Sequence, residues 1–255
     1  MEIITSASNK IIKHIKSLHL RKNREENSEF FVEGLRFVNE AFASDYEISQ
    51  VVISESFYDN YTDERRMVLD RYKTTVISDK LFLEISDTNS PQGIMAIVKM
   101  RKNEQDRSLQ KVVILDGIQD PGNMGTIIRS ADAFALSCIV ISDGCVDVYN
   151  PKVLRATMGS IFHIPVYKSE DITRFIAELK EAEYTVYAAH LDGEDLACVR
   201  GGGKSALIIG NEANGIRGDV SSLANCLVRI PMPGRAESLN ASVAASILMY
   251  EIYCK

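Results

Sequence analysis

DGIQDPGNMGTIIRSADAFA, residues Asp116–Ala135, contains the clearest indication of fold class in this chain. It overlaps the end of KVVILD, residues Lys111–Asp116, which is apolar without alternation, as in a strand buried on both faces of a parallel sheet. A Pro–Gly turn and Asn123 come next, and the apolar residues of Thr126–Ala135 then have helical spacing. Strand, turn and helix in this order predict an α/β unit that presents Asn123 and Arg129 at the carboxyl edge of the sheet, where such folds bind ligands.

The remainder of the C-terminal half continues this alternation. Further strands are predicted at Cys138–Ile141, Ile164–Tyr167, Tyr184–Ala189, Ala206–Ile209 and Leu227–Ile230. Further helices are predicted at Val153–Ile161, Asp171–Ala182 and Leu239–Tyr253. Strands that alternate with helices favour a parallel sheet with helices packed on its faces.

The N-terminal half also alternates between strands and helices. Strands are predicted at Glu29–Val32, Val51–Ser54, Thr75–Ile77 and Ile94–Met100, and helices at Asn9–Leu20, Leu35–Ala43 and Asp63–Tyr72. The polar run Met100–Gln110 then has almost nothing to bury, as in a domain linker. We therefore predict a smaller N-terminal α/β domain, residues 1–105, and a larger C-terminal domain, residues 106–255.

Composition excludes several classes of protein. The 255 residues carry a net charge of −6, which argues against bulk electrostatic attraction to nucleic acid. Neither a secretory signal nor a membrane-spanning run of apolar residues is present. The five cysteines are odd in number and show no C-x-x-C pair, so we expect reduced thiols in a cytoplasmic protein, with no metal site and no membrane association.

One region departs from the acidic average. Residues 1–24 contain six basic residues and one acidic residue, and the helical spacing of the apolar residues places Lys10, Lys13 and Lys16 on the opposite face of the first predicted helix. Such a face is either simply solvated or a patch that contacts phosphates, in which case binding would weaken with salt.

Two later loops carry polar residues at predicted strand ends. Strand Ala206–Ile209 runs directly into Gly210 and Glu212, and a glycine there would let a ligand approach the backbone. After strand Leu227–Ile230 a proline-rich loop leads to Ser238, which we expect to cap the last helix, with Asn240 in its first turn. Free N–H groups at such a terminus favour electron-rich ligand groups.

A nucleotide-binding loop is not supported. RGGGKS, residues Arg200–Ser205, lacks the first glycine of the phosphate-loop pattern, because Cys198 stands there. The run also precedes a strand instead of opening a helix.

Taken together, three segments resemble the motifs of the SpoU (TrmH-like) family of RNA ribose 2′-O-methyltransferases. They are NMGTIIRSADAFA from Asn123, LIIGNEANGI from Leu207 and IPMPGRAESLNASVAASI from Ile230. YNPKVLRATMGSIFHIPV from Tyr149 is similar to the segment between the first two motifs. FFVEGLRFVNEAF from Phe30 and SPQGIMAIV from Ser90 are similar to the RNA substrate-binding domain, of the ribosomal-protein type, that precedes the catalytic domain in many members.

The resemblance implies a SPOUT-class fold, in which the C-terminal parallel sheet is tied in a trefoil knot. It also implies S-adenosylmethionine as the cofactor, bound by backbone groups of the knot loops. By matching position, Gly210, Ile230 and Leu239 would line the cofactor, with Ala189 and His190 nearby. Members are typically homodimers with the site near the interface.

The resemblance also implies roles for five polar residues. Asn123 and Arg129 match the first motif, Glu212 the second, and Ser238 and Asn240 the third. The family gives the arginine the role of base, although a guanidinium is a poor base, so Arg129 is equally a candidate to polarise the hydroxyl or clamp a phosphate. Glu212 is better suited to orienting partners.

These observations predict S-adenosylmethionine-dependent 2′-O-methylation of a ribose in structured RNA. The roughly one hundred residues before the catalytic domain favour ribosomal RNA. The alternatives are a tRNA ribose methyltransferase and a non-catalytic RNA-binding protein on the same fold. Lys10, Lys13 and Lys16 are the predicted RNA contacts of the first domain.

Overall fold

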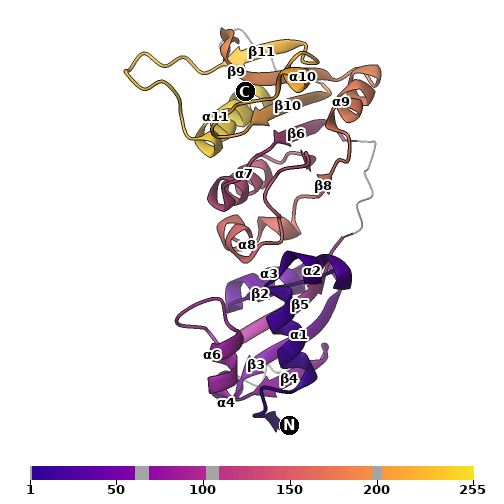
Figure 1. Cartoon of the computed structure of the whole chain (residues 1–255), viewed down its shortest axis with the longest axis vertical. Helices are drawn as coiled ribbons and strands as arrows, with labels where there is room; N and C mark the ends of the chain where they lie inside the picture. The colour runs from indigo at the N-terminus through magenta and orange to yellow at the C-terminus, as the bar shows by residue number, and fades with distance from the viewer. Residues whose placement is uncertain (1, 61–68, 102–108, 197–202) are drawn as a thin grey trace. The chain divides into compact units, whose positions relative to one another are not determined.

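The computed structural model describes residues 2–60, 69–101, 109–196 and 203–255. The chain divides into two compact units (Figure 1): Met1–Lys102 with Tyr149–Leu154, and Asn103–Val148 with Arg155–Lys255. The predicted boundary at residues 105 and 106 lies outside the described residues and stays a prediction. In the part of the chain that is described, no helix combines the length and apolar character needed to cross a membrane.

The N-terminal unit is built on a mixed five-stranded sheet in the order β1-β4-β3-β5-β2. Its strands are β1 (Ile3–Ile4), β2 (Glu29–Glu33), β3 (Ile48–Ser54), β4 (Thr74–Ile77) and β5 (Ile94–Lys99). β5 is antiparallel to β2 and β3, whereas β4 is parallel to β1 and β3. The sheet therefore contains both parallel and antiparallel neighbours, as mixed sheets of α/β proteins commonly do.

Helices of the N-terminal unit bury one apolar face each. They are α1 (Lys10–Leu18), α2 (Arg21–Asn27), α3 (Leu35–Ala43), α4 (Glu55–Asp59) and α6 (Asp79–Ile85). Ile12, Ile15 and Leu18 of α1 pack with Phe82 and Ile85 of α6 in one core cluster, which confirms the predicted apolar face of the first helix. Asn9 caps α1 by accepting a hydrogen bond from the Ile11 N–H at 2.9 Å.

The expected elements of this unit are only partly observed. Short helices α2, α4 and α6 were not predicted, since five to seven residues give too little periodicity to distinguish a helix from a loop. Of the predicted helix Asp63–Tyr72, residues 63–68 lie outside the described part, and residues 69–72 include the end of a helix and a turn.

The C-terminal unit is a six-stranded sheet in which every neighbouring pair is parallel, in the order β11-β9-β10-β6-β7-β8. Its strands are β6 (Lys111–Asp116), β7 (Cys138–Ile141), β8 (Val166–Lys168), β9 (Thr185–Asp195), β10 (Ser205–Gly210) and β11 (Cys226–Arg229). This confirms the parallel sheet expected from the unalternating KVVILD strand.

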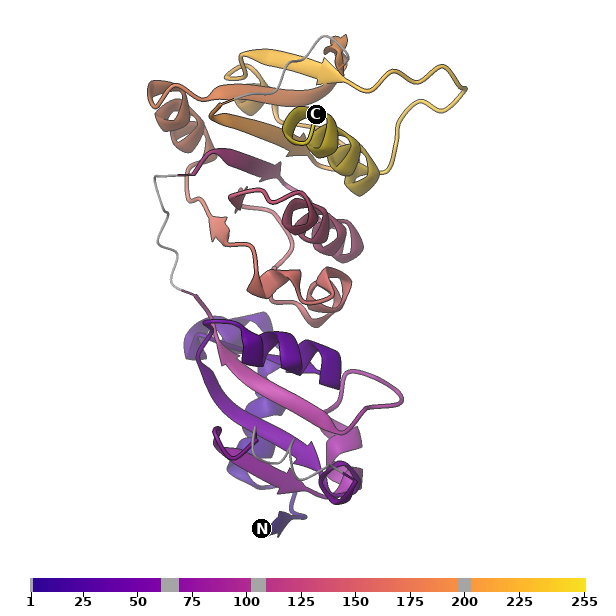
Figure 2. The same cartoon turned by 180° about the vertical axis from the view of Figure 1, so that it is seen from behind.

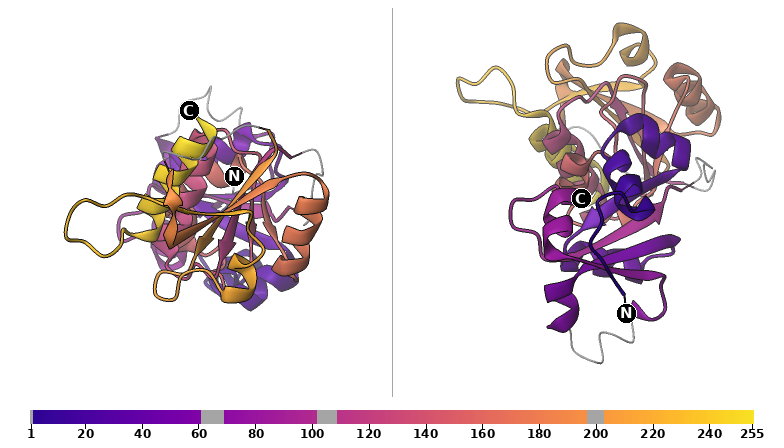
Figure 3. Two further views of the ribbon diagram at one scale, coloured as in Figure 1. Left: turned by 90° about the horizontal axis from the view of Figure 1, so that it is seen from above. Right: turned by 60° about the horizontal axis from the view of Figure 1, so that its bottom comes forward.

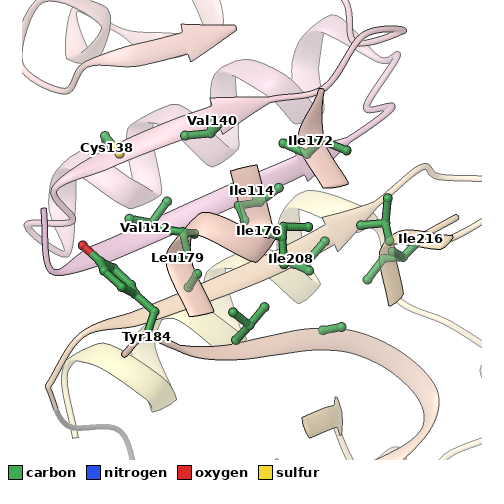
Figure 4. Packing of buried hydrophobic residues seen from close by; sticks show 14 of the residues in the cluster. Val112, Ile114, Cys138, Val140, Ile172, Ile176, Leu179, Tyr184, Ile208 and Ile216 are labelled. Carbon is green, nitrogen blue, oxygen red and sulfur yellow. The ribbon is translucent and has the colours of Figure 1, made fainter. Parts of the chain in front are cut away.

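Helices cover this sheet on both faces. Ile172, Ile176 and Leu179 of α9 (Ile172–Glu181) pack on Val112 and Ile114 of β6, together with the other residues labelled in Figure 4. On the opposite face, α7 (Pro121–Ala133) and α11 (Ala241–Tyr253) lie side by side, as Figure 2 shows from behind. The hydroxyls of Ser130 and Ser246 meet at 2.8 Å between these helices.

Helix α7 begins five residues earlier than expected. Asp120 is its N-cap and accepts a hydrogen bond from the Asn123 N–H at 2.7 Å, while Pro121 occupies the first turn. Proline is well suited to this place because its missing N–H would have had no partner there. Pro121 and Gly122 therefore belong to the helix, and Asn123 lies in its first turn.

Helix α11 begins two residues later than expected, at Ala241. Its N-cap is Asn240, whose side chain accepts hydrogen bonds from the N–H groups of Ser242 and Val243, so the prediction that Ser238 caps this helix is wrong. The spacing of Leu239, Val243, Ile247 and Tyr250 predicts an inner apolar stripe for this helix, and this prediction is also wrong, because Val243 and Tyr250 are each 47% exposed. The buried face carries Ser242, Ala245, Leu248, Met249, Ile252 and Tyr253.

Smaller differences occur between these helices. The predicted helix Val153–Ile161 is α8 (Pro151–Thr157) followed by a separate 3-10 turn, η1 (Ser160–Phe162). Met158 and Gly159 between them have φ values of 52° and 104°, which end a right-handed helix. A short helix, α10 (Gly218–Ser221), was not predicted.

Candidate active site

A cavity of about 310 Å³ lies where β10 and β11 end, beside residues 189–191 of β9. The carboxyl ends of parallel strands meet at one edge of a sheet, so three separate segments converge here. All five residues predicted to bind the cofactor line this cavity: Ala189, His190, Gly210, Ile230 and Leu239. Glu212 and Ser238 line it as well. The walls of the cavity consist of backbone at the strand ends and of apolar side chains such as Leu239 and Leu248. Such walls suit a flat, partly apolar ligand, so the residues present fit S-adenosylmethionine.

The wall after β10 is a tight loop that closes on itself. Asn211 and Gly215 exchange two backbone hydrogen bonds at 2.9 Å, and the Asn211 side-chain oxygen accepts from the N–H groups of Ala213 and Asn214. Its amide also donates to the Gly117 carbonyl at 2.7 Å, which ties the loop to the end of β6. The loop is thus held in shape by its own polar groups.

Gly210 is required by this loop for a different reason than expected. A Cβ atom at Gly210 would lie 2.2 Å from the Gly215 carbonyl carbon and from the Ile216 nitrogen. The space on the Cβ side of Gly210 is therefore filled by the chain's own backbone, while Gly210 still lines the cavity.

Asn123, Glu212 and Asn240 form one hydrogen-bonded chain. The Asn123 amide donates to Glu212 Oε1 at 3.0 Å, and the Asn240 amide donates to Asn123 Oδ1 at 2.9 Å. Each residue comes from a different sequence motif, and the three are brought together by α7, the β10–α10 loop and α11. Because Asn240 also caps α11, the carboxylate is linked through two amides to the start of that helix.

The Glu212 carboxylate also accepts hydrogen bonds from the backbone N–H groups of Gln119 and Asp120, each at 3.2 Å. Partial burial raises its pKa, but the Asn123 amide and these N–H groups together leave the pKa below its ordinary value. Glu212 is thus an anion whose oxygens are used to position neighbours, which makes it a weak proton acceptor.

Arg129 and Ser238 are not part of this chain of hydrogen bonds. Arg129 is exposed on α7, and within the described part of the molecule no hydrogen bond or ion pair is observed for its guanidinium. Ser238 is exposed in the loop between β11 and α11, where it lines the cavity. Of the five predicted catalytic residues, three form this chain of hydrogen bonds, and two, Arg129 and Ser238, are exposed outside it.

The loop that carries Ser238 is open. Residues 231–240 are exposed apart from a half-buried Met232, and the loop extends away from the rest of its unit (Figure 3). Its proline-rich sequence provides few internal hydrogen bonds, so no helix or strand forms before Ala241.

Strand β9 contains an excursion beside the cavity, that is, a stretch that leaves the pairing with β11. Leu227 of β11 pairs with Ala188, but the next residue, Val228, pairs with Glu194, so residues 189–193 of β9 are skipped by the pairing. Ala189, His190 and Leu191 of this excursion line the cavity. A Cβ at Gly193 would lie 2.6 Å from the backbone of β11, so glycine allows the strands to rejoin.

An ion pair between a buried carboxylate and an exposed arginine lies behind the loop, and no motif in the sequence indicated it. Asp116, 2% exposed at the end of β6, accepts hydrogen bonds from the N–H and the Nε of Arg217, both at 3.0 Å. Arg217 is the N-cap position of α10, so the pair attaches the far end of the loop to the sheet. In the sequence, the sign of this pair was Asp116 itself, a single carboxylate at the end of an otherwise apolar strand, which needs a partner when buried.

The predicted RNA contacts lie in the N-terminal unit. Lys10, Lys13 and Lys16 are all exposed on α1, and Lys16 pairs with Glu84 at 3.2 Å. Arg24 does not join them: it is 3% exposed and donates to the Leu18 and His19 carbonyls at the end of α1.

The two histidines of the first helix are engaged within the N-terminal unit. His14 contacts Glu29 at 2.6 Å, and His19 contacts the Ile85 carbonyl at 3.2 Å. Both histidines therefore have partners within this unit.

Two family models match the chain. Residues 110–250 match the SpoU rRNA Methylase family, and residues 9–96 match the MRM3-like substrate binding domain. The two matches lie in the two halves of the chain that the sequence analysis had separated.

Individual relatives extend over the whole chain. The chain is 35% identical to the 23S rRNA (guanosine(2553)-2′-O)-methyltransferase RlmP of Bacillus subtilis, over 99% of both sequences. The crystal structure of an AdoMet-bound rRNA methyltransferase from Sinorhizobium meliloti superposes with a TM-score of 0.85 at 31% identity, covering 98% of this chain and 97% of the other. By contrast, a structure concerned with 2′-OH methylation of C/U34 on tRNA covers 57% of this chain and 95% of its own, with a TM-score of 0.52 at 26% identity.

The second and third motifs line one cavity, and the first is joined to its wall by the hydrogen bond from Asn123 to Glu212. Family and relatives agree over both halves of the chain. The chain therefore belongs to the SpoU rRNA methylase family and is an S-adenosylmethionine-dependent RNA ribose 2′-O-methyltransferase.

Proposed function

We propose that this protein methylates a ribose 2′-hydroxyl of large-subunit ribosomal RNA in the cytoplasm. The observation that carries the proposal is the cavity at the ends of β10 and β11, beside residues 189–191 of β9. Glu212 lies on its wall, and the amides of Asn123 and Asn240 are linked to that carboxylate. Relatives of full length support ribosomal RNA, because the rRNA enzymes match both halves of this chain whereas the tRNA structure covers little more than half.

Mapping of 2′-O-methylated positions in total RNA tests this proposal. Deletion of the gene should remove one methylation from large-subunit rRNA, and the purified protein should restore it on the deletion-strain RNA. A lost tRNA methylation with unchanged rRNA would support the tRNA alternative and contradict the proposal.

S-adenosylmethionine, when bound, supplies a methyl group on an electrophilic sulfonium. Ala189, His190, Gly210, Ile230 and Leu239 would hold it in the cavity. The protein's own contribution is then mainly positioning, which is worth about 7–11 kcal/mol when donor and acceptor are aligned. Asn240 and Glu212 would keep the start of α11 and the β10–α10 loop in register on two sides of the cavity.

Arg129 is proposed to act on the RNA, next to the ribose hydroxyl that accepts the methyl group. Its exposed guanidinium, with no observed partner in the described residues, is available to RNA, and it is suited to a bidentate phosphate contact or to polarising the ribose hydroxyl. Ser238, exposed beside the cavity, would contact the RNA or the cofactor from the open loop.

Replacement of Arg129 by lysine tests this role. We expect kcat to fall at least about 10-fold, because lysine keeps the charge but not the planar two-donor geometry, while cofactor affinity stays unchanged. The measurement is kcat as a function of pH together with S-adenosylmethionine binding. Full retention of the rate at every pH would remove Arg129 from the base, polarising and clamp roles.

A homodimer is also part of the proposal. Val243 and Tyr250, each 47% exposed, place an apolar stripe on the outer face of α11, and Phe134 of α7 extends it through a ring contact at 5.7 Å with Tyr250. A second copy is the proposed cover, since an exposed apolar stripe of this kind marks an association surface. Val243→Glu should convert a dimer in light scattering into a monomer, whereas a wild-type monomer would contradict the proposal.

The trefoil knot of the family is proposed for the segment that contains the β10–α10 and β11–α11 loops. The match to the SpoU rRNA Methylase family supports it, since the resemblance to that family implies the knot. Lys10 and Lys13 are proposed to contact RNA phosphates, and replacing both by Gln should flatten the salt dependence of RNA binding.

A further inference from the structure

A second cavity, of about 500 Å³, lies within the N-terminal unit and is unrelated to the methyl-transfer site. It is lined by the end of β3, by α4 and α6 (labelled in Figure 1), and by the segment before β5. We propose that it takes one unpaired nucleobase of the RNA substrate, namely a base whose Watson–Crick edge carries an imino N–H beside a carbonyl, which is uracil or guanine. The inference rests on the proposed function, since it assumes an RNA substrate.

The acceptor in this cavity is Asp79. Its carboxylate receives hydrogen bonds from the Ser56 hydroxyl at 2.5 Å and the Ser56 N–H at 3.2 Å, which fix its orientation. The Ser56 hydroxyl, followed by the Ser56 N–H and Ser54, holds the pKa of Asp79 below its ordinary value. An ionised carboxylate has about four acceptor positions, so capacity remains for an N–H donor from a ligand.

The donor in this cavity is Gln92. Its Oε1 accepts a hydrogen bond from the Leu35 N–H at 2.8 Å, so the amide orientation is defined and its amino end is the group left for a ligand. Asp79 as acceptor and Gln92 as donor complement an imino N–H next to a carbonyl. Adenine and cytosine lack that imino N–H, and they offer a ring acceptor that a carboxylate would repel.

The apolar part of the cavity suits a base rather than a phosphate. Phe57 and Phe82 line it, and Leu83, 55% exposed, lies at the same cavity. Aromatic side chains stack on unpaired bases, and RNA-binding proteins read such bases along their Watson–Crick edges. The Asp79 charge would repel a phosphate, so the backbone of the RNA is expected to stay outside.

Gly93 keeps the cavity in shape. Its φ is +81°, and a Cβ there would lie 2.6 Å from Ser54 Oγ and 2.8 Å from Phe57 Cβ. Glycine thus allows the segment before β5 to pass close to the residues that hold Asp79 and the aromatic face.

The test uses the full-length protein and single-stranded octaribonucleotides U8, (GU)4, A8 and C8, with binding measured by fluorescence anisotropy. We expect U8 or (GU)4 to bind at least about 10-fold more tightly than C8, as one hydrogen bond to a charged group allows. If uracil is the base, N3-methylation of U8 should abolish the preference. If guanine is the base, only (GU)4 should be preferred, and replacing its guanines by inosines should retain the imino contact.

Asp79→Asn should reduce the preference to less than about 3-fold, because an amide can accept from or donate to any base. Asp59→Asn, an exposed carboxylate on α4 outside the cavity, is the matched control and should leave the preference unchanged. Phe57→Leu should weaken binding of all four oligonucleotides without changing their order, because stacking does not select a base. Thermal unfolding of each variant verifies its fold.

Equal affinities for the four oligonucleotides, or a preference that Asp79→Asn leaves intact, would overturn the inference. These outcomes are independent of methyl transfer. A protein that methylates rRNA but shows no base preference would refute this site alone, and one that shows the preference without methylating rRNA would refute the proposed substrate alone.

Discussion

The two loops that border the cofactor cavity are built in opposite ways. The β10–α10 loop is closed by backbone pairing between Asn211 and Gly215 and is attached to the sheet by the Asp116–Arg217 ion pair. The β11–α11 loop is exposed over nearly its full length and is anchored only where Asn240 caps α11. The first loop is therefore a preformed wall, and the second is the part of the site free to adjust to cofactor and RNA.

This contrast explains where the polar groups of the two loops lie in the fold. Glu212 sits on the rigid loop, where several N–H donors hold it ionised, so its task is orientation. Ser238 sits on the open loop, where no secondary structure positions it before a ligand arrives. Preorganised groups lose little entropy on binding, whereas a loop that orders on binding costs part of the affinity.

The largest effect is expected for an added methyl group on the rigid loop. Gly210→Ala would place a Cβ 2.2 Å from backbone atoms, which cannot move as a flexible side chain can. We expect a loss of about 3 kcal/mol in the free energy of unfolding, or failure to fold. Gly234→Ala on the open loop is the control, because nothing lies within 4 Å of its Cβ position. Similar urea midpoints for the two variants would contradict the contrast between the loops.

A smaller loss is expected when Glu212 is replaced by Gln. In the variant, a neutral amide would face the N–H donors of Gln119 and Asp120 in place of the carboxylate. We expect the free energy of unfolding to fall by about 1–3 kcal/mol at neutral pH. The folded-state pKa of Glu212 is lowered, so its stabilisation is complete above the unfolded value of 4.5 and is lost as pH falls through the folded value. The difference between wild type and variant in denaturant unfolding should therefore shrink below about pH 4.5; a difference that grows on acidification would contradict the assignment.

A loss of about 1 kcal/mol is expected for Asn240→Ala, which removes both the cap of α11 and the bond to Asn123. Ser238→Ala should leave the unfolding free energy unchanged, since Ser238 is exposed and caps no helix. The pair is compared by thermal unfolding and by kcat. If Ser238→Ala proved as destabilising as Asn240→Ala, the open loop would be more ordered than its exposure indicates.

The smallest effect in this series concerns a residue at the end of α7. Ala135 has a φ of +53°, a conformation that glycine adopts more readily. Ala135→Gly should raise the unfolding free energy by about 0.5–1 kcal/mol. It should leave methyl transfer unchanged, because Ala135 lies outside both loops; a lower stability would show that the turn tolerates alanine without strain.

The predictable part of the fold came from periodicity and strand type. The buried run before Asp116, the parallel C-terminal sheet and the apolar face of α1 were all foreseen, because burial on one or two faces leaves a regular trace in the sequence. Helix ends were less predictable. The start of α7 at Pro121 and of α11 at Ala241 depend on which side chain reaches a free N–H, and several candidates stand close together in the sequence.

The candidate site follows the same division. Motif resemblance singled out Asn123, Glu212 and Asn240, but not the hydrogen bonds that join them. The outward orientation of Val243 and Tyr250 was missed, because an apolar residue on a helix has the same spacing whether it faces the core or another surface. Asp116 was overlooked as a partner of Arg217, since the two are 101 residues apart.

By itself, the amino-acid sequence determined the family, the parallel sheet and the residue types that carry the chemistry, since these depend on local patterns and on motifs. Only the tertiary structure decided which N–H groups hold the Glu212 carboxylate, that Gly210 makes room for the chain itself, and that Arg129 is exposed on α7. These properties depend on atoms brought together from distant segments, and no local pattern records such distances.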